Sequence, residues 1–396
     1  MKIAIVVHGR FHAFDLAREL IGLGHEVLLL TNYPRRWPEK FGVPAGNVRS
    51  LVAHGIVSRA ALALGKAAGN EKLGEAFLHR WFGRWAAGVI EKNPVDGSHT
   101  FSGIAEEILS DPSARQKIRS VVRGSSHIRL QRQILEEEEK RAGQRIDKPS
   151  DWMIRREERE YQLADLIICL SRFALESFRH EGVPENKLIL NPLGVRQAVF
   201  RAPAEVLERR KQRIRKGRLR VLTTGSFSLR KGALDYLDVA EKMGSQFELV
   251  FRGDVAPDAR YLRDRAGKVI RFLPRVEQHQ LPEDYFRADL FLFPTLEDGY
   301  AAVLAQASAA GLPVLATTNC GARDFLTEGE DAWIFPIRRP DLIVNRLDWC
   351  ERNREALAHV AEQAGKSKPG IEWRERAKQL LEAYEEFMKR KKLNGS

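Results

Sequence analysis

A strand, a tight turn and a helix of small residues, between residues 290 and 311, constrain the fold of this chain more than any other stretch. The apolar run Leu290–Phe293 predicts a short buried strand that ends at Pro294, and the helix that follows stops at Gly311. The turn between them reads EDG. Because it joins the carboxyl end of a strand to the amino end of a helix, its unpaired backbone N–H groups favour an anion. An acidic residue there serves either as a helix cap or as a hook for a ligand.

The helix predicted over residues 300–310 is built almost wholly of alanine and other small residues, so it can lie close to a sheet or a ligand. Gln306 is its only long polar side chain. Asp298 lies eight positions earlier, slightly more than two helical turns, so both side chains can point toward one pocket. The alternative is that Asp298 caps the helix and Gln306 faces water. The pattern by itself allows both.

The chain opens with alternating elements. Residues 2–7 predict a β-branched strand, a helix follows to about Leu23, and residues 26–31 predict a second strand. This β-α-β order implies a parallel, doubly wound sheet. A fresh strand at residues 219–223 starts a second unit, and 396 residues exceed a single core. We predict an α/β protein with two Rossmann-like domains that face each other across a cleft.

One segment carries a family resemblance. It reads EDGYAAVLAQASAAGLPVLAT, is followed by GARD, and resembles the signature of retaining GT-B glycosyltransferases of the "glycosyl transferases group 1" family. Asp298 and Gln306 stand where that family carries two glutamates. Asp keeps the charge on a shorter arm, whereas Gln loses it. The resemblance implies transfer of a sugar from a nucleotide-sugar donor with retention, and a last helix that crosses back to the first domain.

Two adjacent cations begin the second domain. Arg230 and Lys231 follow a strand and precede a helix, where a guanidinium fork and a compact ammonium suit a diphosphate. The resemblance implies that they neutralise the leaving nucleotide, and that the segment at Arg275-Val276 holds the base. The predicted donor-binding residues are Gly9, Gly225, Arg230, Lys231, Arg275, Val276, Asp298, Gly299 and Gln306.

Polar residues also follow strands of the first domain. Gly9, Arg10 and His12 lie in the first loop, which the resemblance places beside the donor and the acceptor; a plain surface turn is the alternative. His99 and His127 lie at two later strand ends, where an open α/β sheet presents ligand groups, although ten histidines make chance placement easy. The predicted catalytic residues are His127, Arg230, Lys231 and Asp298, and the predicted acceptor-side residues are Arg10, His12 and His99.

No Asp-x-Asp metal motif lies near this predicted site, so the two cations would stabilise the departing diphosphate without a metal ion. We expect no metal and no resident cofactor, because the nucleotide sugar is a substrate. Other readings remain open: a GT-B nucleotide-sugar epimerase, a glycan phosphorylase, or a nucleotide-sugar-binding protein without catalysis. The altered glutamate positions motivate the last of these.

Lys and Arg number 65 against 53 Asp and Glu, and the net charge of +12 indicates an anionic partner. No nucleic-acid module is recognisable, so we expect none of that class. The helix that contains Phe77, Trp81 and Trp85 is either core or a surface that rests on an anionic membrane or holds a lipid-linked glycan acceptor. Without a signal peptide or a long apolar run, we expect a cytoplasmic protein, peripheral on the inner face of the membrane.

The expected organisation has four parts: residues 1–195 as an acceptor-side domain, 196–218 as a basic interdomain linker, 219–370 as a nucleotide-sugar-binding domain, and 371–396 as the crossover helix with a basic tail. The acidic run within residues 131–145 and the basic run at 208–218 are both expected to be solvated.

Overall fold

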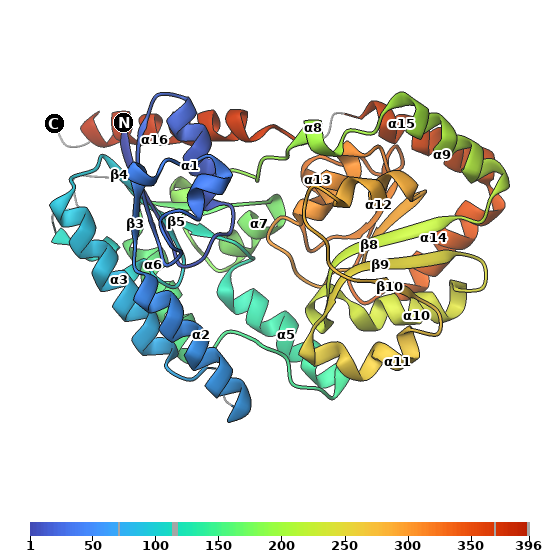
Figure 1. The fold of residues 1–396 in the computed structure, drawn as a ribbon, viewed down its shortest axis with the longest axis horizontal. Helices are drawn as coiled ribbons and strands as arrows, with labels where there is room; N and C mark the ends of the chain where they lie inside the picture. Colours follow the sequence, from blue (N-terminus) through green and yellow to red (C-terminus); the bar gives the residue numbers. More distant parts are fainter. Residues whose placement is uncertain (70–71, 113–117, 368–369, 394–396) are drawn as a thin grey trace.

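Two parallel β-sheets, one in each half of the chain, organise the computed structural model, which describes residues 1–69, 72–112, 118–367 and 370–393. Within these residues the first sheet has seven strands in the order β3-β2-β1-β4-β5-β6-β7, and the second has six in the order β10-β9-β8-β11-β12-β13. Figure 1 shows the two sheets side by side, each with helices packed on it. The predicted α/β architecture is confirmed.

The strands of the first sheet are β1 (Lys2–Val7), β2 (Glu26–Thr31), β3 (Val48–Ser50), β4 (Gly97–Phe101), β5 (Ile118–Arg123), β6 (Leu166–Cys169) and β7 (Leu188–Leu190). Its helices are α1 (Ala13–Gly22), α2 (Val52–Ala67), α3 (Glu75–Lys92), α4 (Glu106–Leu109), α5 (Ile128–Ala142), α6 (Asp151–Leu163) and α7 (Arg172–His180). The second sheet comprises β8 (Arg220–Phe227), β9 (Glu248–Val255), β10 (Arg271–Leu273), β11 (Leu290–Phe293), β12 (Val314–Thr317) and β13 (Ala332–Phe335). Its helices are α9 (Ala204–Lys216), α10 (Ala233–Met243), α11 (Arg263–Ala266), α12 (Leu281–Arg287), α13 (Ala302–Ala309), α14 (Pro340–Arg352) and α15 (Arg354–Lys366).

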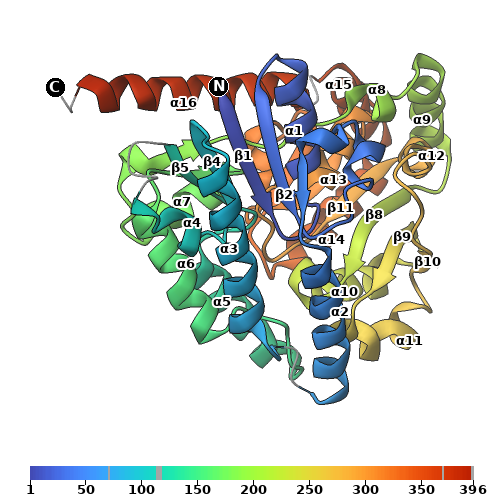
Figure 2. The ribbon, with the colours of Figure 1, turned by 60° about the vertical axis from the view of Figure 1, so that its left-hand side comes forward.

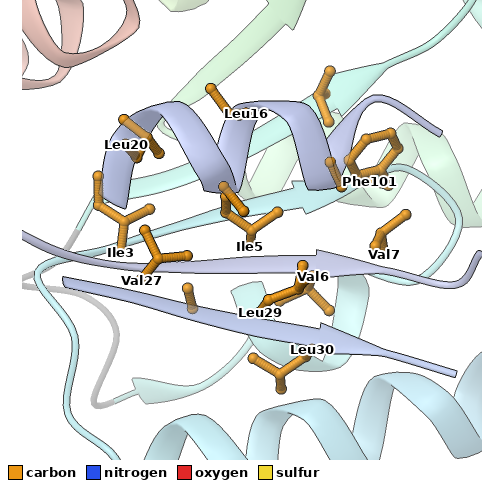
Figure 3. Packing of buried hydrophobic residues seen from close by; sticks show 14 of the residues in the cluster. Ile3, Ile5, Val6, Val7, Leu16, Leu20, Val27, Leu29, Leu30 and Phe101 are labelled. Atoms are coloured by element: carbon orange, nitrogen blue, oxygen red, sulfur yellow. The ribbon is translucent and has the colours of Figure 1, made fainter. Parts of the chain in front are cut away.

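The central strand of each sheet explains why these sequences fold as they do. Residues Ile3 to Val7 of β1 are fully buried, since helices cover both faces, and a strand of this kind reads as a continuous apolar run. Leu16 and Leu20 of α1 pack on it (Figure 3). The strand order reverses beside β1 and again beside β8, and ligands of open α/β sheets bind at the carboxyl ends of such strands. The two reversal points therefore position the site.

The last helix, α16 (Trp373–Leu393), returns to the first domain, as predicted (Figures 1 and 2). Ala377, Leu380 and Tyr384 on its inner face belong to the core of the first sheet. The Tyr384 hydroxyl lies 2.8 Å from Nδ1 of His99 and 2.5 Å from Oγ of Ser120, both buried. The helix thus ties the end of the chain to β4 and β5.

Two charged runs are more buried than the sequence predicts. The basic run forms part of α9, where Arg210 is fully buried and donates to the carbonyl oxygens of Tyr285, Ala288, Ala310 and Gly311. Since these carbonyls lie at the carboxyl ends of α12 and α13, the guanidinium joins parts of the second domain that are far apart in sequence. The prediction of a solvated basic run is wrong at this residue.

The acidic run lies on α5, which reaches across to the second domain (Figure 1). Glu138 is fully buried, and its carboxylate accepts from Arg338 Nε at 3.1 Å. Arg141 pairs with Asp235 of α10 at 2.5 Å, and Leu135 belongs to the second core. The solvated helix expected here is instead a contact between domains.

Candidate functional site

Two connected hollows lie between the domains at the carboxyl ends of the strands. The first hollow, of about 780 Å³, is lined by the loop after β1, by the ends of β4 and β5, and by the start of α13. The second hollow, of about 1310 Å³, is lined by the ends of β8 and β9, by residues 275–281, and by the segment around Trp37 of the first domain. Both are lined by Arg10, Arg196, Gln278 and Gln306, so they form one continuous cleft.

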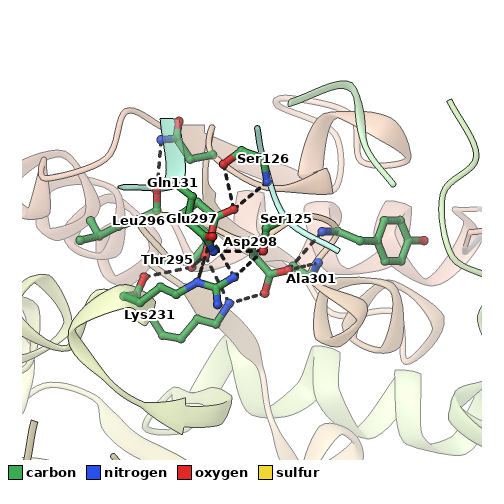
Figure 4. Close-up of polar contacts among 12 residues, drawn as sticks. Ser125, Ser126, Gln131, Lys231, Thr295, Leu296, Glu297, Asp298 and Ala301 are labelled. Carbon is green, nitrogen blue, oxygen red and sulfur yellow. Dashed lines mark hydrogen bonds and ion pairs between the residues drawn. The ribbon is translucent and has the colours of Figure 1, made fainter. Parts of the chain in front are cut away.

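Arg230 and Lys231 lie on the short helical turn Leu229–Lys231 that connects β8 to α10. The turn closes tightly because Ser228 Oγ accepts the Lys231 N–H, and Gly232 adopts φ 76° where a Cβ would lie 1.9 Å from the Pro294 carbonyl oxygen. Lys231 Nζ pairs with Asp298 at 2.5 Å, and Arg230 Nη2 pairs with Glu297 at 2.8 Å (Figure 4). Burial lowers the pKa of Lys231, and Asp298 opposes that shift.

Asp298 has two functions in this arrangement. Its Oδ1 accepts the backbone N–H groups of Tyr300 and Ala301, at 3.1 and 2.8 Å, as a helix cap does. Its Oδ2 faces Lys231, and the residue lines the first hollow. Burial would raise the pKa of this carboxyl, but Lys231 and Arg230 outweigh it and lower the pKa. The capping and ligand alternatives are therefore compatible.

Glu297, which sequence reasoning passed over, connects the two domains. It is fully buried, and its Oε1 accepts from the backbone N–H and the hydroxyl of Ser126, at 2.9 and 3.0 Å. Oε2 accepts from Gln131 at 3.1 Å and from Arg230 (Figure 4). A Cβ on Gly299 would lie 2.3 Å from the Gly124 carbonyl oxygen, so the backbones also meet here. The sequence signal was an acidic pair after a buried strand, of which only the second member was assigned a function.

Gln306 lies partly buried on α13 and lines both hollows. The Tyr285 hydroxyl donates to its Oε1 at 2.9 Å and is itself 2.8 Å from Thr224 Oγ1. Because Oε1 has this partner, the amide offers mainly its N–H groups to the cleft. A glutamate at this position would offer only acceptors.

Three more predicted donor residues, Gly225, Arg275 and Val276, line the second hollow, whereas Lys231 and Gly299 line neither hollow. Gly225 lies two residues before the end of β8 with φ 129°, and a Cβ on Gly253 of the neighbouring strand would lie 1.7 Å from its carbonyl oxygen. Arg275 is 80% exposed on its side chain and lies 3.9 Å from Asp254. Val276 lies beside it in the same wall. The structure thus brings Gly225, Arg275 and Val276 into one hollow with Gln306.

The loop after β1 presents two of its three predicted residues to the cleft. The Arg10 guanidinium carbon lies 3.8 Å from the centre of the Phe41 ring. His12 packs between Phe101 and Trp373 in the first hollow, where burial lowers its pKa to about 4. Gly9 does not line either hollow. Its N–H donates to Asn32 at 2.8 Å, so it shapes the turn that carries Arg10.

Two predicted histidines lie away from both hollows. His99 faces the crossover helix and forms a hydrogen bond with the Tyr384 hydroxyl, so it is a core residue. His127 is 3% exposed; its Nδ1 caps α5 by accepting the Arg129 N–H, and its ring packs on Tyr161 and Phe178. Burial, with Arg123 and Arg129, lowers the pKa of His127 to about 4. The prediction that His127 lines the reaction centre is corrected: its neighbours Ser125 and Ser126 face Arg230 and Glu297 instead.

Among the described residues no helix is both long and apolar enough to cross a membrane. In the same residues, no group of three or more His, Cys, Asp or Glu side chains is placed to hold a metal ion. The predicted independence of metal stays a prediction.

A family comparison covers the second domain. Residues 206–367 match the family described as "Glycosyl transferases group 1". We call these residues the group 1 segment. It contains most of α9, the Arg230–Lys231 turn and the whole of α13, so it includes the predicted donor-binding residues of the second domain.

Curated relatives match the chain over part of their length. A D-inositol 3-phosphate glycosyltransferase of Frankia alni is 24% identical over 195 residues, 49% of this chain and 43% of that protein. A GDP-mannose-dependent alpha-mannosyltransferase of Mycobacterium tuberculosis is 28% identical over 216 residues, 53% of this chain and 55% of that protein. The chain thus spans about half the length of the curated relatives it matches.

Solved structures match the whole chain and not only the group 1 segment. Anabaena HepE in complex with UDP superposes with a TM-score of 0.70 at 14% identity, over 98% of this chain and 100% of that one. Sucrose-phosphate synthase from Thermosynechococcus elongatus superposes with a TM-score of 0.68 at 15% identity, over all of both chains. The fold is GT-B.

Proposed function

We propose that this protein is a glycosyltransferase that moves a sugar from a nucleotide-sugar donor to a glycan or lipid-linked acceptor. The observation that carries the proposal is the Arg230–Lys231 turn, which holds two half-buried cations, each paired with a carboxylate, at the reversal point of the second sheet. Arg230 and Asp298 of this arrangement line the first hollow. The match of residues 206–367 to the group 1 family supports it. The first domain, residues 1–195, binds the acceptor, and the second, residues 219–370, binds the donor.

In the proposed reaction the second hollow holds the nucleoside and the first hollow holds the acceptor. The bond between the anomeric carbon and the diphosphate oxygen breaks, and that oxygen keeps the electron pair. A bond forms between the anomeric carbon and an acceptor hydroxyl oxygen, whose proton passes to the released diphosphate or to water. Arg230 and Lys231 stabilise the charge that develops on the diphosphate, without a metal ion and with retention at the anomeric carbon.

The paired carboxylates give the site a further property. Glu297 and Asp298 neutralise Arg230 and Lys231, so neither cation is left unpaired in this partly buried site. A diphosphate that binds here shares the two cations with the two carboxylates.

A membrane surface is the proposed location of the acceptor. Seven of the thirteen exposed large hydrophobic side chains in the described part of the chain lie on α2, α3 or the segment between them, including Ile56, Leu64 and Phe77. Arg80 and Arg84 of α3 are exposed near them. An apolar face with basic residues is typical of helices that rest on anionic lipid. Neutralising both arginines should weaken binding to vesicles that contain an anionic lipid; unchanged binding would remove this part of the proposal.

The test of the proposed function is a thermal-shift screen against UDP, GDP, ADP, CMP and their common sugar conjugates, with and without magnesium. A ligand that binds only the native state raises the unfolding temperature. A selective, metal-independent shift with one nucleotide family, followed by transfer or slow hydrolysis of its sugar conjugate, is the expected result. A shift with no turnover would indicate a binding protein, and no shift in folded protein would contradict the proposal.

A further inference from the structure

We propose that the first hollow binds an uncharged pyranose ring of a glycan acceptor, stacked on the exposed ring of Phe11, in preference to a phosphorylated acceptor. This inference rests on the proposed function and names the class of acceptor that it takes. Three features of the hollow carry it: an exposed aromatic ring, uncharged hydrogen-bonding groups, and cations that are already paired.

The aromatic ring belongs to Phe11, in the loop after β1. Phe11 lines the first hollow and is 63% exposed. The ring stacks on the buried Phe101, with centres 5.5 Å apart and planes at 27°, so one face is supported and the other is available. The backbone of Phe11 has φ 39°, a conformation that bulky residues rarely adopt and that recurs at ligand sites. A supported aromatic face suits the C–H face of a sugar ring.

Two histidines give the hollow uncharged hydrogen-bonding groups. His8 and His79 both line it, with ring centres 5.0 Å apart. Burial and the neighbouring imidazoles lower the pKa of His8 to about 4 and that of His79 to about 3, so both rings are neutral near pH 7. His79 Nδ1 donates to the Gly103 carbonyl oxygen at 2.8 Å, which leaves Nε2 as an acceptor. Neutral imidazoles match sugar hydroxyls and carry no positive charge that would attract a phosphate.

Among the described residues, each lysine or arginine that lines the first hollow but not the second forms an ion pair with a carboxylate. Lys72 lies 2.7 Å from Asp147, and Arg123 lies 3.1 Å from Glu157. Lys148 pairs with Glu139, and Arg230, which is assigned to the diphosphate of the donor, pairs with Glu297. A phosphate on the acceptor would have to compete with these carboxylates. Arg10 and Arg196, which also line the second hollow, both lie beside Asp15, at 3.9 and 2.7 Å.

The experiment measures saturation-transfer NMR contacts between the full chain and two sets of probes, in the presence of the nucleotide that the thermal-shift screen selects. One set contains methyl α- and β-glycosides of glucose, galactose, mannose and N-acetylglucosamine, and the other contains the 6-phosphates of the same hexoses. The variants are Phe11→Ala, Phe11→Tyr and, as a control, Tyr261→Ala. Tyr261 is 46% exposed in the second domain, outside both hollows.

We expect ring-proton contacts with at least one methyl glycoside, weaker contacts with its 6-phosphate, and binding about tenfold weaker in Phe11→Ala. Phe11→Tyr and Tyr261→Ala should bind as the unaltered chain does. Stronger contact with the phosphates, no contact with any glycoside, or an unaffected Phe11→Ala would each overturn the inference. The nucleotide-induced thermal shift, measured on the same samples, shows that each variant is folded. If the unaltered chain shows no nucleotide-induced thermal shift, the proposed function is contradicted. If it shows the shift but no contact with a glycoside, only this inference is contradicted.

Discussion

Arg230 and Lys231 connect the chemistry of the site to its stability, because each is held by an adjacent carboxylate. Lys231 lies against Asp298, which also caps the start of α13, and Arg230 lies against Glu297, which holds the first domain. A substitution at either cation therefore changes both the charge offered to a diphosphate and the environment of a buried carboxylate. The two carboxylates have different partners, so the two effects can be separated.

Replacing Lys231 by Ala should lower the turnover number about 10²- to 10³-fold, the usual loss when a group that stabilises charge in the transition state is removed. The measurement is steady-state transfer or hydrolysis with the donor identified by the thermal-shift screen. Lys242→Ala is the control, because Lys242 is exposed on α10, away from the cleft. Near-unchanged turnover in Lys231→Ala would show that this lysine does not assist departure of the nucleotide.

Replacing Glu297 by Ala should lower the free energy of unfolding by about 3 kcal/mol, because Ser126, Gln131 and Arg230 all lose their buried partner. Urea unfolding at pH 7 measures it, and Glu297→Gln, which keeps an acceptor, should cost less. Burial would raise the pKa of Glu297, but Arg230 and Lys231 lower it below its ordinary 4.5. The contribution of the charge is therefore complete above pH 4.5 and is lost as the pH falls through the lowered pKa. An equal loss in both variants at every pH would mean that the charge has no part in the contact.

Among the elements, α5 decides how the two domains meet. Its acidic residues are spaced like a solvated helix face, yet Glu138 is fully buried against Arg338, 200 residues later in the chain. Arg338 also donates to Glu137 at 2.7 Å and to the Ile134 carbonyl oxygen at 2.9 Å. The helix thus anchors the first domain on the second, on the side of the cleft opposite the crossover helix (Figure 1).

Replacing Arg338 by Ala should cost about 2 kcal/mol of stability, since the buried Glu138 keeps only Arg141, at 3.4 Å, as a charged partner. The neighbouring Arg339 is a matched control. It pairs with Asp341, and both side chains are half exposed, so Arg339→Ala should leave the stability almost unchanged. Chemical unfolding of both variants checks this. Equal effects would show that burial of Glu138 does not depend on this pair.

At the scale of the whole molecule, the first domain buries an unusual set of histidines. Burial is the largest cause that lowers the pKa in each: to about 4 for His8, His12 and His127, and to about 3 for His79 and His99. In the unfolded chain each would have its ordinary pKa of 6.5. The native state therefore holds these rings neutral over a pH range in which the unfolded state takes up protons.

Acid should consequently unfold the protein over a defined range. Stability is independent of these groups above pH 6.5 and is lost as the pH falls from 6.5 toward about 4, with a slope of about 1.4 kcal/mol per pH unit for each histidine. Urea midpoints between pH 8 and pH 5 measure the slope. In His127→Asn the helix cap is kept, because Asn is a good N-cap, and the slope should fall by about one proton. An identical slope would remove His127 from the set.

The local chemistry of the chain could be predicted because it depends on neighbours in sequence. The alternation of β-branched runs with helices specified two doubly wound sheets, and the Arg230–Lys231 turn was identified because two cations at a strand-to-helix junction suit a diphosphate wherever the turn lies. The spacing of Asp298 and Gln306 predicted that they share one pocket, and both line the first hollow, although α13 begins only at Ala302, four residues after Asp298.

Only the tertiary structure decided which polar groups face the cleft. Glu297 contacts Ser126, 171 residues away in the sequence, and His99 contacts Tyr384, 285 residues away. No local sequence pattern constrains contacts between residues so far apart in the chain. The sequence placed His127 and His99 at strand ends, yet His99 lies in the middle of β4 under α16, and the ring of His127, at the start of α5, turns into the first domain. Strand ends determine where a site lies by topology alone, whereas the side chains that remain exposed there depend on which distant helices cover them.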